Sequence, residues 1–146
     1  MPAPIRRNAL LALLAAFAFV PATRAARAQG TTDRHRVVLQ VSDADPAKWN
    51  LALNNARNIQ ADLGMDNVDV EIVAYGPGLA MLKADSAVAT RIASAHAQGV
   101  GVLACENTMR TVNLTRAQLL PDVKFVDAGV VHLMKRQREG WSYIRP

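Results

Sequence analysis

The chain has 146 residues and a formal net charge of +5, and 51% of its residues are hydrophobic. This length accommodates one domain with a substantial apolar core. The positive charge is concentrated at the start, where residues 1–28 hold four of the 17 basic residues and none of the 12 acidic ones. The rest of the chain therefore carries a formal net charge of only +1 and few aromatic residues, which argues against a nucleic-acid partner.

Residues 1–28 have the pattern of a secretory signal peptide. Arg6 and Arg7 precede an apolar run at residues 9–20, and Ala26-Arg27-Ala28 places small residues at both positions that a signal peptidase reads. The run is shorter than the roughly 20 apolar residues that a membrane span needs, so we expect cleavage after Ala28, with an uncleaved anchor as the alternative. The protein is then exported, and periplasmic if its source has an outer membrane. The arginine pair leaves the Sec and twin-arginine routes open.

The first half of the remaining chain alternates between strand and helix patterns. Residues 35–41 are rich in β-branched residues and predict a strand. Asp45 and Pro46 then fit the N-cap and first position of a helix that Gly64 ends. The apolar side chains of this helix recur at steps of three and four and form one face: Trp49, Ala52, Leu53, Ala56, Ile59 and Leu63.

A second strand is predicted over residues 68–74, followed by the loop Tyr75-Gly76-Pro77-Gly78. This loop lacks the lysine and the glycine spacing of a phosphate-binding loop, so we interpret it as a tight turn. Residues 79–82 have a short helical pattern, and Ser86 is a suitable cap for a helix that runs to Gln98 and stops at Gly99.

The third strand, residues 100–104, leads directly to Cys105, the single cysteine of the chain. Residues 106–120 are polar with short helical signals, and strands are predicted at 123–126 and 141–144, on either side of a helix between Gly129 and Gly140. Strands that alternate with helices predict a mainly parallel sheet covered by helices on both faces, within one domain over residues 29–146.

Cys105 is the main candidate for chemistry. The residue that follows a buried parallel strand lies at the carboxyl edge of the sheet, where α/β folds bind ligands. Asn107, Thr108 and the start of a helix would lower the pKa of the thiol and favour the reactive thiolate, and Arg110 would add positive charge, whereas Glu106 opposes this effect. A lone cysteine in an exported protein cannot form an intramolecular disulfide. The alternative is a buried, inert cysteine that only fills space.

A cysteine-dependent hydrolase would require a histidine beside the thiol. His35 and His96 are expected at the amino edge of the sheet, on the wrong side. His132 follows the fourth strand and could face Cys105, or could simply face solvent. The histidines and the cysteine lack metal-ligand spacing, and we expect no metal and no cofactor.

Several segments together resemble the DsrE/DsrF-like sulfur-relay family, specifically its small exported members. These segments are LNNARN at 53–58, VAYGPG at 73–78, GVLACENTM at 101–109, AGV at 128–130 and RQREGWSYIRP at 136–146. The resemblance implies a three-layer α/β/α fold with a five-stranded parallel sheet, and assembly into homotrimers or hexamers. One departure is Asp127, which stands where the family pattern leads us to expect proline.

In the sulfur-relay members a cysteine at this position accepts sulfur as a persulfide and passes it to a partner thiol, which implies this role for Cys105. Asn107 and Thr108 would then shape the loop, and Gly76 and Gly78 would line the opposite wall. Our leading hypothesis is therefore an exported sulfur-handling protein that works with a thiol-bearing donor or acceptor. The alternatives are a small-ligand-binding or assembly protein with an inert Cys105, and a cysteine-dependent hydrolase.

Overall fold

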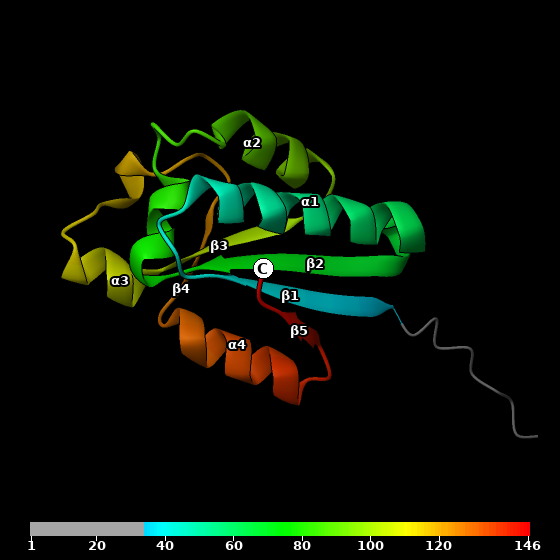
Figure 1. Cartoon of the computed structure of the whole chain (residues 1–146). Coiled ribbons are helices and arrows are strands. Elements are labelled where there is room, and N and C mark those ends of the chain that lie inside the picture. The colour runs from blue at the N-terminus through cyan, green and yellow to red at the C-terminus, as the bar shows by residue number, and fades with distance from the viewer. Residues whose placement is uncertain (1–33) are drawn as a thin grey trace, which may run out of the picture.

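The computed structural model describes residues 34–146, so the predicted signal peptide lies outside the described residues. A five-stranded parallel sheet forms the centre of the molecule, with the strand order β4-β3-β2-β1-β5 (Figure 1). The predicted α/β fold with a parallel five-stranded sheet is thereby confirmed. The strands are β1 (His35–Val41), β2 (Val68–Ala74), β3 (Gly101–Cys105), β4 (Lys124–Val126) and β5 (Ser142–Ile144).

Helices cover both faces of the sheet, which gives the three layers (Figure 1). One face carries α1 (Pro46–Leu63), α2 (Ala89–Ala97) and the 3-10 segment η2 (Gly76–Leu82), and the other face carries α4 (Gly129–Arg138). The short helix α3 (Glu106–Thr111) follows β3 directly, and two further 3-10 turns are η1 (Met65–Asn67) and η3 (Arg116–Gln118).

The long helix α1 begins and ends as its sequence predicts. Asp45 Oδ1 accepts a hydrogen bond from the Ala47 N–H at 2.8 Å, Pro46 occupies the first position, and Gly64 ends the helix with φ +86°. The buried face includes Trp49, whose indole N–H donates to the Asp43 carbonyl at 2.7 Å. The two helix caps and the apolar face are therefore as the sequence predicts.

The core is divided unequally between the two faces of the sheet. Alternate strand residues such as Val37, Leu39 and Ile72 belong to the large cluster beneath α1 and α2. The α4 face buries a small cluster of four residues: Val38, Val73, Leu103 and Leu133. In the described part of the chain α4 therefore covers its face with much less apolar contact than α1 and α2 provide on theirs.

The structure corrects three predicted element boundaries. The helix expected from Ser86 begins at Ala89, because Ser86 belongs to a turn in which its Oγ accepts from the Val88 N–H at 3.3 Å. The third strand starts at Gly101, because the Val100 N–H donates to the Ala95 carbonyl at 3.0 Å and not to a neighbouring strand. At its other end, β3 includes Cys105, which pairs with Val126, so Cys105 is the last residue of the strand and not the first residue beyond it.

Candidate functional site

Cys105 lies at the carboxyl edge of the sheet, where β3 ends and α3 begins. Its backbone is extended, and its Sγ acts as the N-cap of α3 by accepting a hydrogen bond from the Thr108 N–H at 3.4 Å. The residue is 4% exposed and is the one free cysteine of the chain. The thiol therefore lies at the predicted edge of the sheet, and it is almost completely buried there.

Thr108 joins Cys105 to the loop that follows β2. Thr108 Oγ1 accepts a hydrogen bond from the Gly76 N–H at 2.9 Å, and the same hydroxyl lowers the pKa of the Cys105 thiol. A hydroxyl can accept and donate at the same time, so one side chain serves both partners. The structure thus brings together three of the residues predicted for the site.

The loop between β4 and α4 also contacts the site, beside the β3–α3 junction and the loop after β2. The Asn107 N–H donates to the Asp127 carbonyl at 3.0 Å, so Asp127, the departure from the family pattern, contributes its backbone here. Gly129 is the first residue of α4, and its backbone N–H favours the thiolate form of Cys105. A Cβ on Gly129 would lie 3.0 Å from Tyr75, so glycine allows the tyrosine ring to pack against the start of α4.

Two opposing effects act on the pKa of the Cys105 thiol. Burial raises the pKa, because it penalises the charged thiolate. The Thr108 hydroxyl and the backbone N–H groups of Gly129, Thr108 and Asn107 favour the thiolate and together outweigh burial. The pKa of Cys105 is therefore below its ordinary value, which is the condition for a nucleophilic sulfur near neutral pH.

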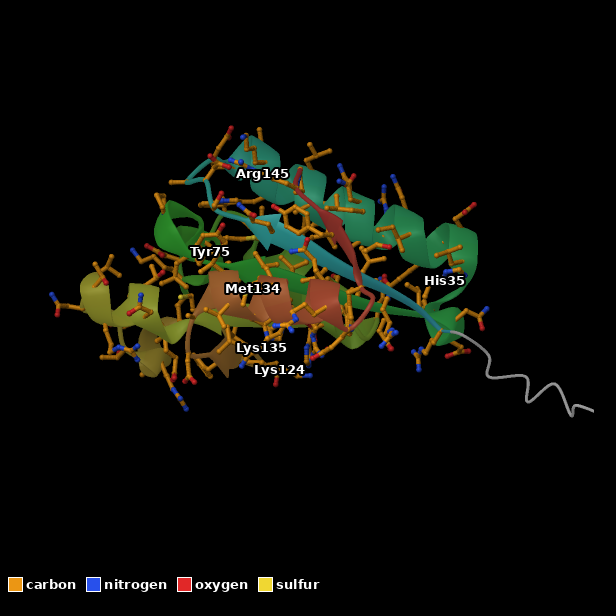
Figure 2. All side chains as sticks on the ribbon, turned by 90° about the horizontal axis from the view of Figure 1, so that it is seen from below. His35, Tyr75, Lys124, Met134, Lys135 and Arg145 are labelled. Carbon is orange, nitrogen blue, oxygen red and sulfur yellow. The ribbon has the colours of Figure 1, made fainter. Side chains whose placement is uncertain are left out.

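Tyr75 is a candidate site residue that the sequence interpretation did not include. It follows β2 directly and thus lies at the same edge as Cys105, which is the signal that could have indicated it. Burial raises the pKa of Tyr75, and the nearby acidic groups of Tyr143, Asp43 and Cys105 add to the rise while Arg145 opposes it. Figure 2 places Tyr75 and Arg145 at this end of the sheet. Tyr75 is thus a neutral phenol at the same edge of the sheet as the thiol.

The other residues predicted for the site lie further from the sulfur. Gly78 is buried against the end of β1, where a Cβ would lie 2.3 Å from the Val41 carbonyl oxygen. Arg110 is exposed in the last turn of α3. The carboxylate of Glu106 forms an ion pair with Arg116, which also stacks over the Phe125 ring at 4.2 Å. This ion pair offsets the negative charge beside Cys105.

His132 is not placed as the base of a cysteine dyad, and the expectation that it could face Cys105 is corrected. Its Nε2 lies 2.8 Å from Glu71 Oε2, and Arg136 donates to the same carboxylate from Nε at 2.9 Å and from Nη2 at 2.6 Å. Glu71 pairs with Gly101, four residues before Cys105 and thus about 13 Å away along the sheet. The bond to the Glu71 carboxylate therefore holds the imidazole of His132 away from the sulfur of Cys105.

The two remaining histidines also lie away from the thiol. His35 begins β1, and His96 lies in the last turn of α2, both toward the amino edge of the sheet. Within residues 34–146, no group of three His, Cys, Asp or Glu side chains could hold a metal ion. None of the helices in this part of the chain has both the length and the apolar character that crossing a bilayer requires.

Comparison with known proteins agrees with this architecture. A family model described as the DsrE/DsrF-like family matches residues 16–146. The chain belongs to the DsrE/DsrF-like family. A solved structure, MTH1491 from Methanobacterium thermoautotrophicum, is 39% identical, with a TM-score of 0.73, and the match covers 77% of this chain and 99% of that one.

A second solved structure of similar shape is BT1422 from Bacteroides thetaiotaomicron. It is 12% identical, with a TM-score of 0.59, and the match covers 80% of this chain and 98% of that one, so it supports the fold alone. Both solved structures are described as proteins of unknown function. A search of the curated proteins found no match. Membership in the DsrE/DsrF-like family links the chain to sulfur relay, and the predicted resemblance is confirmed.

Proposed function

We propose that the protein carries sulfane sulfur on Cys105 and transfers it to an acceptor thiol. The observation that carries this proposal is the set of hydrogen-bond donors around one buried cysteine, which holds the pKa of the thiol below its ordinary value. A sulfur carrier needs a thiolate that attacks sulfur and later gives sulfur up again. Family membership supports the same chemistry.

The transfer is a thiol exchange that needs no external oxidant or reductant. The Cys105 thiolate attacks the outer sulfur of a donor persulfide, R–S–SH, and forms a new sulfur–sulfur bond. The donor bond breaks, its electron pair leaves with R–S⁻, and the proton stays on the transferred sulfur as Cys105–S–SH. An acceptor thiolate repeats the step in reverse. The N–H groups of Thr108 and Gly129 would stabilise negative charge at Cys105 each time it is released.

Polysulfide loading tests the proposal directly. The purified protein is incubated with a polysulfide, and its intact mass is compared with that of Cys105→Ser. We expect wild type to gain one sulfur atom that dithiothreitol removes, and Cys105→Ser to gain none. Equal sulfur uptake by both proteins would refute the carrier role.

The burial of Cys105 supports one alternative, a ligand-binding or assembly protein in which the cysteine is inert. A small thiol reagent distinguishes the sulfur carrier from a protein with an inert cysteine. Labelling of Cys105 in the native protein supports the carrier, whereas labelling only in denaturant supports the inert alternative. The contact between His132 and Glu71 argues against the hydrolase alternative, because this histidine would have to serve as its base.

We also propose that the protein is exported after cleavage following Ala28, as the pattern of residues 1–28 indicates. Expression of the full chain followed by fractionation and N-terminal sequencing tests this. We expect a processed protein that starts at Gln29 in the exported fraction. A full-length product that stays in the cytoplasm would contradict the proposal.

We further propose that the protein forms a homo-oligomer through the outer side of α4. Val130, Val131 and Met134 are 60%, 39% and 52% exposed, and they lie on the face with the small core (Figure 2 labels Met134). Burial of such a patch against a second copy would remove apolar surface from water. Light scattering should give a multiple of the chain mass for wild type and a smaller mass for Val130→Asp. A monomeric wild type would refute self-association.

A further inference from the structure

Tyr75 and Cys105 are neighbours on one face of the sheet. The strands β2 and β3 pair Ala74 with Ala104, and the two residues that follow this pair, Tyr75 and Cys105, both have an extended backbone. Paired positions in neighbouring strands lie about 4.8 Å apart and direct their side chains to the same face. Tyr75 packs against the small cluster under α4, to which Leu103, two residues before Cys105, belongs. The tyrosine ring therefore stands beside the sulfur on the face that α4 covers.

The sulfur is enclosed on its other sides as well. Val126 of β4 pairs with Cys105 opposite Tyr75 and packs against the same cluster. A Cβ on Gly129 would lie 3.0 to 3.2 Å from Cβ, Cδ1 and Cγ of Tyr75, so the ring lies against the first turn of α4 (Figure 2). Thr108 closes the side toward α3, where its N–H donates to Sγ at 3.4 Å. Together these neighbours leave Cys105 only 4% exposed.

Tyr75 is the neighbour that can set how wide a reaction partner reaches the sulfur. Its ring is the largest side chain of this enclosure, and it is partly exposed at the edge of the sheet. Gly129 contributes backbone alone, and the Thr108 hydroxyl is held by the Gly76 N–H at 2.9 Å. Burial raises the pKa of Tyr75 most, and the charge of Cys105 adds to the rise, which agrees with the proximity of the two groups. The ring is therefore an uncharged wall beside the thiolate.

We propose that the ring of Tyr75 limits the sulfur donors of Cys105 to narrow, unbranched molecules, above all inorganic polysulfide, and excludes bulky organic persulfides. This inference rests on the proposed carrier function and names the class of its donor. A polysulfide is a chain one sulfur atom wide, whereas an organic persulfide carries its bulk next to the reacting sulfurs. Four per cent exposure of Cys105 suits the first shape and not the second.

Loading from polysulfide needs no further reactant. The Cys105 thiolate attacks the terminal sulfur of hydrogen polysulfide, HS–Sₙ⁻, and the bond next to that sulfur breaks. Its electron pair leaves with the shortened chain, Sₙ²⁻, which takes a proton from water, while the attacked sulfur keeps its own proton in Cys105–S–SH. The outer sulfur of this persulfide lies about 2 Å beyond Sγ, so an acceptor thiol does not have to enter as far as the donor. The size limit therefore acts on loading more than on release.

Two reagents with the same reactive group test the size limit without any sulfur relay. Methyl methanethiosulfonate is narrow and benzyl methanethiosulfonate is bulky, and the rate of each at Cys105 is divided by its rate with free cysteine. We expect the normalised rate of wild type to be at least about tenfold higher for the methyl reagent. Tyr75→Leu keeps an apolar side chain but removes the ring, and it should lower this ratio to about threefold or less. Tyr75→Phe keeps the ring and should keep the ratio.

Tyr143→Leu is the matched control for the loss of a tyrosine. Tyr143 lies on β5, which β1 and β2 separate from β3, and its hydroxyl bonds Gln40. We expect Tyr143→Leu to keep the wild-type ratio, and urea unfolding checks that each variant is folded. A ratio near one in wild type, which needs no variant, would overturn the proposal. So would an unchanged ratio in folded Tyr75→Leu, or an equal loss in Tyr143→Leu.

Sulfur loading then tests the class of donor. Inorganic polysulfide and glutathione persulfide are compared by intact mass, with each rate again divided by that with free cysteine. We expect wild type to load at least about tenfold faster from polysulfide, and Tyr75→Leu to reduce this preference to about threefold or less. Equal normalised loading of wild type from both donors would overturn the size limit and leave the carrier role intact. Loading from neither donor, with the alkylation ratios as expected, would refute the carrier role and support the size limit.

Discussion

The hydroxyl of Thr108 can be removed almost without changing the size of the side chain, which makes it the sharpest test of how the site activates sulfur. Thr108→Val removes the donor to Cys105 and the acceptor of the Gly76 N–H. The backbone donors from Gly129, Thr108 and Asn107 remain. We expect the pKa of Cys105 to rise and the fraction of thiolate at neutral pH to fall.

The size of the effect follows from the type of bond that is lost. Hydrogen bonds to charged groups contribute about 1.5–3 kcal/mol, and sulfur is a weak acceptor, so the low end applies. Because about 1.4 kcal/mol corresponds to a factor of ten, the thiolate fraction should fall and alkylation of Cys105 at pH 7 should be slower in Thr108→Val than in wild type, by up to about tenfold. Thr108→Ser keeps a hydroxyl and should recover most of the rate.

The assay is the rate of iodoacetamide alkylation between pH 5 and pH 10, followed by intact mass. The midpoint of the wild-type profile should lie below that of an ordinary thiol, about 8.5, and the Thr108→Val midpoint should lie above that of wild type. Thr111→Val is the matched control, because the Thr111 hydroxyl bonds only the Asn107 carbonyl, at 3.0 Å. Coincident profiles for Thr108→Val and wild type, or an equal shift in Thr111→Val, would refute the reasoning.

Three further predictions concern stability and can be checked by urea unfolding. Glu71→Gln should cost about 1–3 kcal/mol at pH 7, because the carboxylate bonds His132 and Arg136 in a largely buried setting. Burial raises the pKa of Glu71, but these partners bring it below the usual value, so the wild type keeps this advantage at neutral pH and loses it as the pH falls through that lowered pKa. A constant difference between the two proteins down to pH 3 would contradict this. Gly78→Ala should cost about 1–3 kcal/mol, because its Cβ would approach the Val41 carbonyl oxygen to 2.3 Å, and an unchanged midpoint would exclude that close contact. Leu133→Ala should cost about 2–5 kcal/mol, since this side chain is 3% exposed within the small α4 cluster, and a loss below 1 kcal/mol would mean that α4 is held mainly by polar contacts.

Much of the candidate site was predictable from local patterns. The apolar run before Cys105 and the polar residues after it indicate a strand end and a helix start, and that position is at the carboxyl edge of a parallel sheet. Thr108 was predicted from the same helix start, whereas Gly76 was assigned to the site only with the sulfur-carrier hypothesis. Tyr75 also lies just beyond a strand, but its sequence pattern indicated only a turn.

The partners of the charged residues were not predictable in this way. His132 and Glu71 are 61 positions apart, and each has an ordinary interpretation in its own element. Their pairing depends on how α4 crosses the sheet, which no local pattern specifies. For this reason the sequence alone allows a dyad between His132 and Cys105, whereas the structure pairs the imidazole with Glu71.

The sequence by itself determined the order of strands and helices and the edge of the sheet at which Cys105 lies, because hydrophobic periodicity and capping residues act over a few positions. Only the tertiary structure decided the environment of the sulfur. Its donors come from α3 and from the start of α4, and the loop after β2 positions one of them, so they meet only when the sheet has assembled. The pKa of a buried group depends on contacts within a few ångströms, and these contacts cannot be inferred from the spacing of residues along the chain.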